Sequence, residues 1–138
     1  MSGLVLGFDY GQKRVGVATG QALTGTATPL TTLVNPQFGG WGAFDALLAQ
    51  WRPQTLVVGL PLAADGSDTT VSQAARRFAT ELGDRSGLAV ALIDERLSSH
   101  EAEARLAADG RRPPAMRERR DAVAAAIIVE TWLAEHAH

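Results

Sequence analysis

The chain has 138 residues, no cysteine and a formal net charge of −2. At about 150 residues per domain, this length predicts a single domain spanning residues 1–138. With 46% hydrophobic and 20% charged residues, the composition is that of a globular domain and excludes a disordered or collagen-like chain. The lack of cysteine also excludes a disulfide scaffold, thiol catalysis and a cysteine-ligated zinc site.

The N-terminal third predicts three strands. Leu4–Phe8 and Arg14–Thr19 are apolar segments separated by a glycine-containing turn, a pattern typical of a hairpin. Thr28–Val34, rich in threonine and valine, predicts a third strand, and the dipeptide that follows it, Asn35-Pro36, interrupts the chain. These three strands are therefore expected to be antiparallel.

The middle of the chain alternates between helix and strand. Apolar residues recur every three or four positions from Phe44 to Trp51, which predicts a helix that ends at Arg52-Pro53. Thr55–Gly59 is a short, uniformly apolar strand. Ser67 or Asp68 is expected to cap the next helix, whose apolar face runs over residues 71–82.

The C-terminal third predicts one more strand and two helices. Leu88–Ile93 is the fifth strand. Ser98 and Glu101 form a capping-box pattern for a short helix that ends near Ala108. A final helix is expected from Ala115 to Glu135. The whole pattern predicts an α/β fold, in which a mixed sheet of three antiparallel strands and two further parallel strands is covered by helices on both faces.

Three acidic sites occur where water is expected to be scarce. Asp9 directly follows the first apolar strand, and Asp94 and Glu95 directly follow the fifth. Ligand sites in open α/β sheets lie at the carboxyl ends of strands, so these acids are candidates for one site. Asp121 heads the apolar stripe of the last helix, because residues 125, 128 and 132 lie four, seven and eleven positions further on.

The chemistry that suits such a cluster is metal-assisted phosphoryl transfer. Mg²⁺ and Mn²⁺ prefer hard oxygen ligands. Two ions about 3.5–4 Å apart can activate water and stabilise the leaving oxygen. The alternative for Asp121 is a structural role, either in an ion pair with Arg96 or Arg119 or as an acid favoured at a helix start.

Positive charge is concentrated just before Asp121. Residues 105–120 carry six arginines against two acids, a local net charge of +4. Such a segment attracts a phosphate backbone, although a solvated charged loop is the alternative. The candidate nucleic-acid contacts, from this segment and from the surroundings of the first and fifth strands, are Lys13, Arg14, Arg96, Arg111, Arg112, Arg119 and Arg120.

Four sequence blocks together resemble a known family. In the order and spacing of the YqgF/RuvX family, the chain contains Phe8–Ala18 (FDYGQKRVGVA), Val57–Pro61 (VVGLP) with Gly66, Asp94–Ser99 (DERLSS) and Asp121–Glu130 (DAVAAAIIVE). The family is similar to the Holliday-junction resolvase RuvC and has an RNase H-like fold. Its bacterial members are generally described as pre-16S rRNA nucleases, and some as Holliday-junction resolvases.

The resemblance implies roles for the acids. Asp9, Glu95 and Asp121 correspond to the catalytic, metal-binding acids of RNase H-like nucleases, with Asp94 an alternative ligand beside Glu95. Many family members have a lysine shortly before the helix aspartate, where this chain has Arg119 and Arg120. The implied function is a metal-dependent nuclease that acts in 5′-end processing of pre-16S rRNA. The alternative substrate is junction DNA in recombination and repair.

Two other classes of function compete with a nuclease. The turn after Asp9 also resembles the phosphate loop of actin-like ATPases, but those enzymes close two domains around the nucleotide and this length supplies one. A non-catalytic ribosome-maturation factor could keep the fold without the activity. The expected partner is nucleic acid, with a homodimer left open. No apolar run approaches the roughly 20 residues of a membrane span, and no signal peptide precedes Leu4, so we expect a cytoplasmic protein without membrane association.

Overall fold

The structure is a computed structural model that describes residues 3–95 and 115–136, with the side chains of residues 115–119 left undescribed. One five-stranded sheet has the order β3-β2-β1-β4-β5. Its strands are β1 (Leu4–Tyr10), β2 (Arg14–Gln21), β3 (Thr26–Val34), β4 (Thr55–Leu60) and β5 (Val90–Asp94). The helices are α1 (Pro36–Gly39), α2 (Gly42–Trp51), α3 (Thr70–Ser86) and α5 (Ala115–His136).

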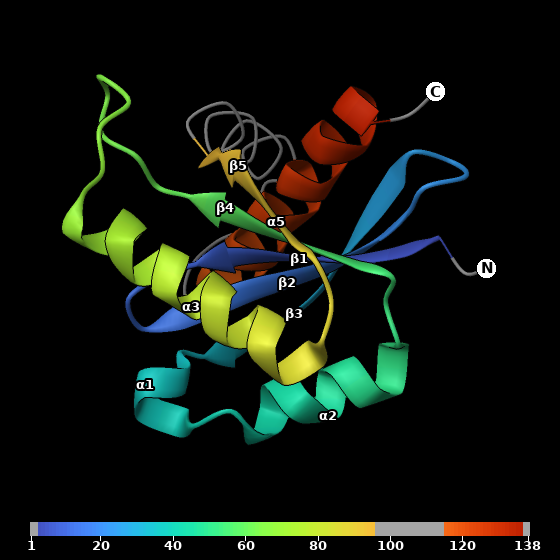
Figure 1. Ribbon diagram of the computed structural model, residues 1–138, viewed down its shortest axis with the longest axis horizontal. Coiled ribbons are helices and arrows are strands. Elements are labelled where there is room, and N and C mark those ends of the chain that lie inside the picture. Colours follow the sequence, from blue (N-terminus) through green and yellow to red (C-terminus); the bar gives the residue numbers. More distant parts are fainter. Residues whose placement is uncertain (1–2, 96–114, 137–138) are drawn as a thin grey trace.

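The sheet is mixed, as the sequence predicts. β1, β2 and β3 pair antiparallel, whereas β4 is parallel to β1 and β5 is parallel to β4. The arrowheads of β1, β4 and β5 therefore point toward the same end of the molecule (Figure 1). Because β1 and β4 lie in the interior of the sheet, nearly all of their residues are buried, which explains their uniformly apolar sequences.

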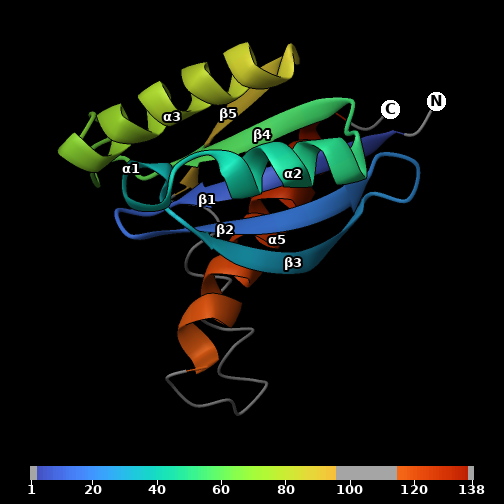
Figure 2. The same cartoon turned by 90° about the horizontal axis from the view of Figure 1, so that it is seen from below.

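Helices cover both faces of the sheet. Figure 2 shows α2 and α3 on one face and α5 on the other. Side chains alternate between the two faces along each strand, so Leu6 and Phe8 pack under α2 and α3 while Val5 packs under α5. The predicted stripe of α5 is confirmed for Ala125 and Ile128, both of which are fully buried against the sheet.

Glycines in the strands allow α5 to pack very close to the sheet. A Cβ atom built at Gly7 would lie 2.1 Å from Cγ2 of Val129, and one at Gly20 would lie 2.3 Å from Cγ1 of the same side chain. Any larger residue at these positions would push the helix outward. The α5 face is thus built from a helix of small and branched residues resting on glycine and alanine.

Several local predictions need correction. The N-cap of α3 is Thr69, rather than Ser67 or Asp68. Its Oγ1 accepts a hydrogen bond from the Ser72 amide at 2.9 Å, and its own amide donates to Ser72 Oγ at 2.6 Å. This reciprocal capping box satisfies two backbone groups at once, which a cap at Asp68 would not. Asp68 instead accepts a hydrogen bond from Ser72 Oγ.

Strand and helix ends also differ from the prediction. β1 extends through Asp9 to Tyr10, so Asp9 lies within the strand rather than after it. β5 begins at Val90, two residues after the predicted start. The Asn35-Pro36 dipeptide begins α1 as well as ending β3, because Asn35 Oδ1 accepts a hydrogen bond from the Gln37 amide.

The predicted helix from Ser98 to Ala108 lies outside the described residues. The final helix is confirmed and ends one residue later than predicted, at His136. Among the helices that the structure describes, none is long and apolar enough to cross a membrane.

Candidate active site

Asp9 lies near the end of the central strand β1, on the face that α5 covers. It pairs with Gly16 on β2 and with Gly59 on β4. Directly paired residues project from the same face of a sheet, so the carboxylate of Asp9 has a glycine on either side. The space that two side chains would fill is therefore open to groups from outside the sheet.

Those two glycines bring the other acids close. A Cβ atom at Gly16 would lie only 1.9 Å from the backbone oxygen of Asp121, so α5 crosses the sheet directly beside Asp9. A Cβ atom at Gly59 would lie 3.4 Å from Oε2 of Glu95. Asp9, Glu95 and Asp121, which come from β1, the end of β5 and α5, therefore converge around one point of the sheet.

Asp9 and Glu95 share a hydrogen bond. Burial raises the pKa of Asp9 well above its ordinary value, and the nearby charges of Glu95 and Asp121 raise it further. Burial also raises the pKa of Glu95, with Asp121 and Asp94 adding to the effect, while the hydrogen bond with Asp9 opposes it. A hydrogen bond between two carboxyl groups requires a proton on one of them, and the raised pKa values favour that proton.

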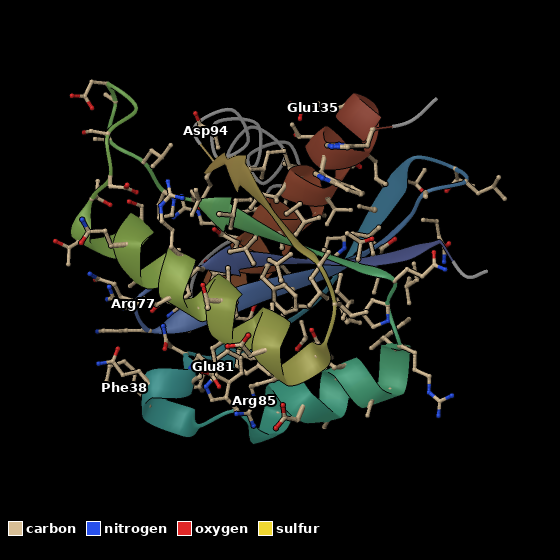
Figure 3. All side chains as sticks on the ribbon, in the orientation of Figure 1. Phe38, Arg77, Glu81, Arg85, Asp94 and Glu135 are labelled. Carbon is tan, nitrogen blue, oxygen red and sulfur yellow. The ribbon has the colours of Figure 1, made fainter. Side chains whose placement is uncertain are left out.

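Alternation along β5 separates Asp94 from Glu95. Ile93 packs against α5, and Glu95, two residues later, reaches the same side. Asp94 shares the strand face of Val90, which packs on the α3 side. Figure 3 shows Asp94 at the end of β5. The structure thus brings Glu95 to Asp9, whereas Asp94 acts on the pair through its charge on Glu95.

Asp121 forms an ion pair with Arg14. Nε of Arg14 donates to Oδ2 of Asp121 at 2.9 Å. The two side chains remain 35% and 21% exposed, so the pair lies at the edge of the cluster rather than in the core. The sequence-based alternative for Asp121 named Arg96 or Arg119 as its partner. The partner in the structure is Arg14, which was expected to contact nucleic acid.

Of the other predicted nucleic-acid contacts, only some lie within the described residues. Lys13 and Arg120 are exposed, and Lys13 lies in the turn between β1 and β2, next to Arg14. Arg96, Arg111 and Arg112 lie outside the described residues, as does the side chain of Arg119. For all of these residues, contact with nucleic acid stays a prediction.

Asn35 is a site-positioning residue that the sequence analysis did not single out. It is a polar residue only 2% exposed. Its side-chain amide donates to the backbone oxygen of Gly11 at 2.8 Å, and its backbone N–H donates to that of Lys13 at 2.9 Å. Asn35 therefore holds the turn that carries Lys13 and Arg14 beside the acids. The available signal was the Asn-Pro dipeptide, which indicates a break but not a long-range contact.

The donor set fits a hard divalent cation. Oε2 of Glu95 is a buried carboxylate oxygen, and the nearby charges of Glu95 and Asp121 raise the pKa of Asp9, a repulsion that a bound cation would relieve. Within residues 3–95 and 115–136, no three acidic or histidine side chains are yet close enough to hold one ion. The carboxylate of Asp121 is instead paired with Arg14.

A comparison with protein families identifies the family of this chain. The family model RuvX, described as a Holliday junction resolvase, matches residues 3–135. The chain belongs to the RuvX family. This membership confirms the resemblance noted in the sequence, and it favours a nuclease family over the actin-like ATPases.

Curated RuvX relatives cover nearly the whole chain. A protein of Azotobacter vinelandii is 48% identical over 98% of this chain and 97% of its own length. A protein of Pseudomonas paraeruginosa is 44% identical over 96% and 93%, and one of Dechloromonas aromatica is 43% identical over 99% and 94%. All three carry the name "Putative pre-16S rRNA nuclease".

Solved structures extend the likeness to RuvC. RuvC of Thermus thermophilus, in complex with a Holliday junction substrate, is 19% identical with a TM-score of 0.56, covering 96% of this chain and 94% of that chain. A second structure of Thermus thermophilus RuvC is 18% identical with the same TM-score of 0.56, over 96% and 95%. At these identities the likeness concerns the fold, and it confirms the predicted RNase H-like architecture of this RuvX chain.

Proposed function

We propose that this RuvX protein is a metal-dependent nuclease that hydrolyses phosphodiester bonds in the 5′-end processing of pre-16S rRNA. The observation that carries the proposal is the convergence of Asp9, Glu95 and Asp121 around the glycine-flanked end of β1. A purely structural role would not explain this arrangement. Burying acids together opposes their ionisation, and it raises the pKa values of Asp9 and Glu95.

The three acids would hold the cation, and we propose a pair of Mg²⁺ or Mn²⁺ ions. A divalent cation held by these acids would offset the charge of the cluster and of the phosphodiester, and would supply the means to activate water. Asp9 would be the central ligand, because it lies on the central strand and interacts with both Glu95 and Asp121. Glu95 joins it from the end of β5, and Asp121 joins it from α5. Asp94 contributes negative charge behind Glu95.

The basic residues would bind the substrate backbone. Lys13 and Arg14 border the acids on the β1–β2 turn, and Arg120 is exposed one residue before Asp121. Together with Arg96, Arg111, Arg112 and Arg119, they would add positive charge that attracts phosphates. Binding through phosphates is independent of sequence and weakens with salt.

The proposed substrate is RNA, because the names of the curated relatives refer to pre-16S rRNA. The family description favours a second candidate, a Holliday junction, for the same catalytic acids. Both substrates are phosphodiesters with branched or structured backbones, so the acids alone do not distinguish them. We propose a cytoplasmic location and keep a homodimer as a prediction, which sedimentation velocity measures.

One cleavage panel tests the proposal. Structured pre-rRNA, single-stranded RNA, single-stranded DNA and a four-way junction are each incubated with Mg²⁺, Mn²⁺ or EDTA. We expect metal-dependent cleavage that is fastest on pre-rRNA. Asp9→Asn should lower the rate about a thousandfold, equivalent to about 4 kcal/mol of transition-state stabilisation, because it removes the central ligand.

The matched control is Asp84→Asn, which makes the same change at an exposed position on α3. It should cut at the parental rate. Equal cleavage by the Asp9→Asn and parental proteins would overturn the proposed site. Binding of pre-rRNA without cleavage under any metal condition would support the non-catalytic maturation factor instead.

A further inference from the structure

The ion pair between Arg14 and Asp121 joins a substrate-binding candidate to a metal-binding candidate. The two residues are 107 positions apart in the chain, yet their side chains meet at 2.9 Å. Arg14 is the first residue of β2, and Gly16, two residues later on the same strand face, contacts the backbone of Asp121. The contact is therefore set by the close crossing of α5 over β2.

Two features suggest that this ion pair can exchange. Its side chains are 35% and 21% exposed, so water reaches both charges and the interaction is a weak one. It also engages the carboxylate of Asp121, which the proposed function requires as a ligand. A cation entering beside Asp9 and Glu95 competes with Arg14 for the same carboxylate.

We propose that Arg14 neutralises Asp121 in the metal-free protein and transfers to a phosphate oxygen of the nucleic-acid substrate when a divalent cation takes over Asp121. Metal binding and substrate binding are then coupled through one side chain. The guanidinium is always charged and forms directional hydrogen bonds to carboxylate or phosphate alike. This inference rests on the proposed nuclease function and adds to it the order in which charges are exchanged.

The proposed exchange requires a fixed backbone next to Arg14. The turn before Arg14 must stay in place while the side chain changes partner. Asn35 provides this anchor through its hydrogen bonds to the backbone of Gly11 and Lys13, at 2.8 and 2.9 Å. Only the long side chain of Arg14 needs to move, by rotation about its own bonds.

The first test measures metal affinity by calorimetry, without substrate. Arg14→Gln should bind Mg²⁺ about two- to fivefold more tightly than the parent, because a competitor for Asp121 is lost. The matched control is Arg77→Gln, the same change on α3, where Figure 3 shows the side chain. It should leave the affinity unchanged. Unchanged or weaker binding by Arg14→Gln would overturn the exchange, since it would make Arg14 neutral or supportive toward the metal site.

The second test measures binding of a labelled RNA oligonucleotide in EDTA and in Ca²⁺, with the RNA checked for integrity. In EDTA, Arg14→Gln should bind only slightly more weakly than the parent, through the uncompensated charge of Asp121, because Arg14 itself is held by Asp121. In Ca²⁺, the variant should bind several-fold more weakly. Lys13→Gln should weaken binding by the same factor in both conditions. An equal loss in EDTA and Ca²⁺ for Arg14→Gln would mean that its phosphate contact is independent of the metal.

The conservative variant Arg14→Lys controls for a folding defect in Arg14→Gln. It keeps the charge but loses the planar guanidinium, so it should fold and show a smaller coupling than the parent. If the parent cleaves with metal and Asp9→Asn does not, but the Arg14 variants show no coupling, only the exchange fails. If Asp9→Asn cleaves like the parent, the proposed function fails first.

Discussion

The two faces of the sheet are packed with different kinds of residue. The α2–α3 face has an aromatic core in which the ring of Phe78 lies 5.2–5.9 Å from those of Phe8, Tyr10, Trp41 and Phe44. The α5 face has glycine and alanine beneath a closely packed helix. Large rings fill volume and contribute most to stability, whereas small residues let backbone and carboxylates approach. We therefore expect the α2–α3 face to contribute most to stability and the α5 face to hold the proposed site.

The pKa shifts of the acids also differ between the two faces. On the α2–α3 face, a hydrogen bond from Arg85 lowers the pKa of Asp45, and hydrogen bonds from Ser72 and Arg76 lower that of Asp68. On the α5 face, burial raises the pKa values of Asp9 and Glu95. Acids on the first face are satisfied by partners within the fold. On the second face Asp121 pairs with Arg14, whereas burial opposes the ionisation of Asp9 and Glu95, a shift that is common at functional sites.

Removing a ring from the aromatic face should have the largest effect on stability. Phe78→Ala should lower the free energy of unfolding by about 3–5 kcal/mol, because the cavity leaves its aromatic neighbours without contacts. Cleavage per folded molecule should stay near the parental value, since the acids lie on the other face. Urea denaturation and a rate corrected for the folded fraction measure both. A strong loss of the corrected rate would mean that the two faces are not separate.

Filling the space beside Asp9 should have a smaller effect on stability and a larger one on activity. Gly16→Ala places a Cβ atom 1.9 Å from the backbone oxygen of Asp121, so α5 must shift. We expect a loss of about 1–3 kcal/mol and loss of metal-dependent cleavage, measured by the same two methods.

The control for this change is Gly42→Ala, at the start of α2, where an added Cβ atom would meet nothing within 4 Å. It should keep activity and change stability by about 1 kcal/mol or less. Full cleavage by Gly16→Ala would show that the position of α5 over β2 is not critical for the acids.

The smallest expected effect is a difference in how the two faces respond to pH. Because the folded-state pKa values of Asp9 and Glu95 are raised, the folded protein keeps protons that the unfolded chain releases. Metal-free stability should therefore fall as pH rises from about 4 through the folded-state pKa values. Asp9→Asn should flatten this fall, and Mg²⁺ should offset it in the parent. Thermal melts without metal from about pH 2.5 to 8 measure the slope.

Asp45 should behave in the opposite way. Its pKa is lowered in the folded protein, so its stabilising contribution is present above about pH 4 and is lost as pH falls below that value. Asp45→Asn should therefore alter only the acid side of the profile. Matching pH profiles for Asp9→Asn and Asp45→Asn would contradict the assignment of different roles to the two faces.

Much of the site could be predicted because its signals are local. Apolar runs placed Asp9 at the end of β1 and Glu95 after β5, and helical periodicity placed Asp121 on the stripe that packs against the sheet. The choice between Asp94 and Glu95 was left open by the residues alone. Side chains alternate along a strand, so once Ile93 is known to face α5, Glu95 rather than Asp94 is expected on the side of Asp9.

The sequence by itself determined the order of the five strands and of α2, α3 and α5, the antiparallel hairpins, the apolar face of α5 and the three acidic sites. Each of these depends on residues that are near one another in the chain. Only the tertiary structure decided that Gly16 and Gly59 flank Asp9 and that Arg14, rather than Arg96 or Arg119, pairs with Asp121. These contacts depend on strand register and on how closely one helix packs against the sheet. Both are set by the packing of distant segments, which local periodicity does not encode.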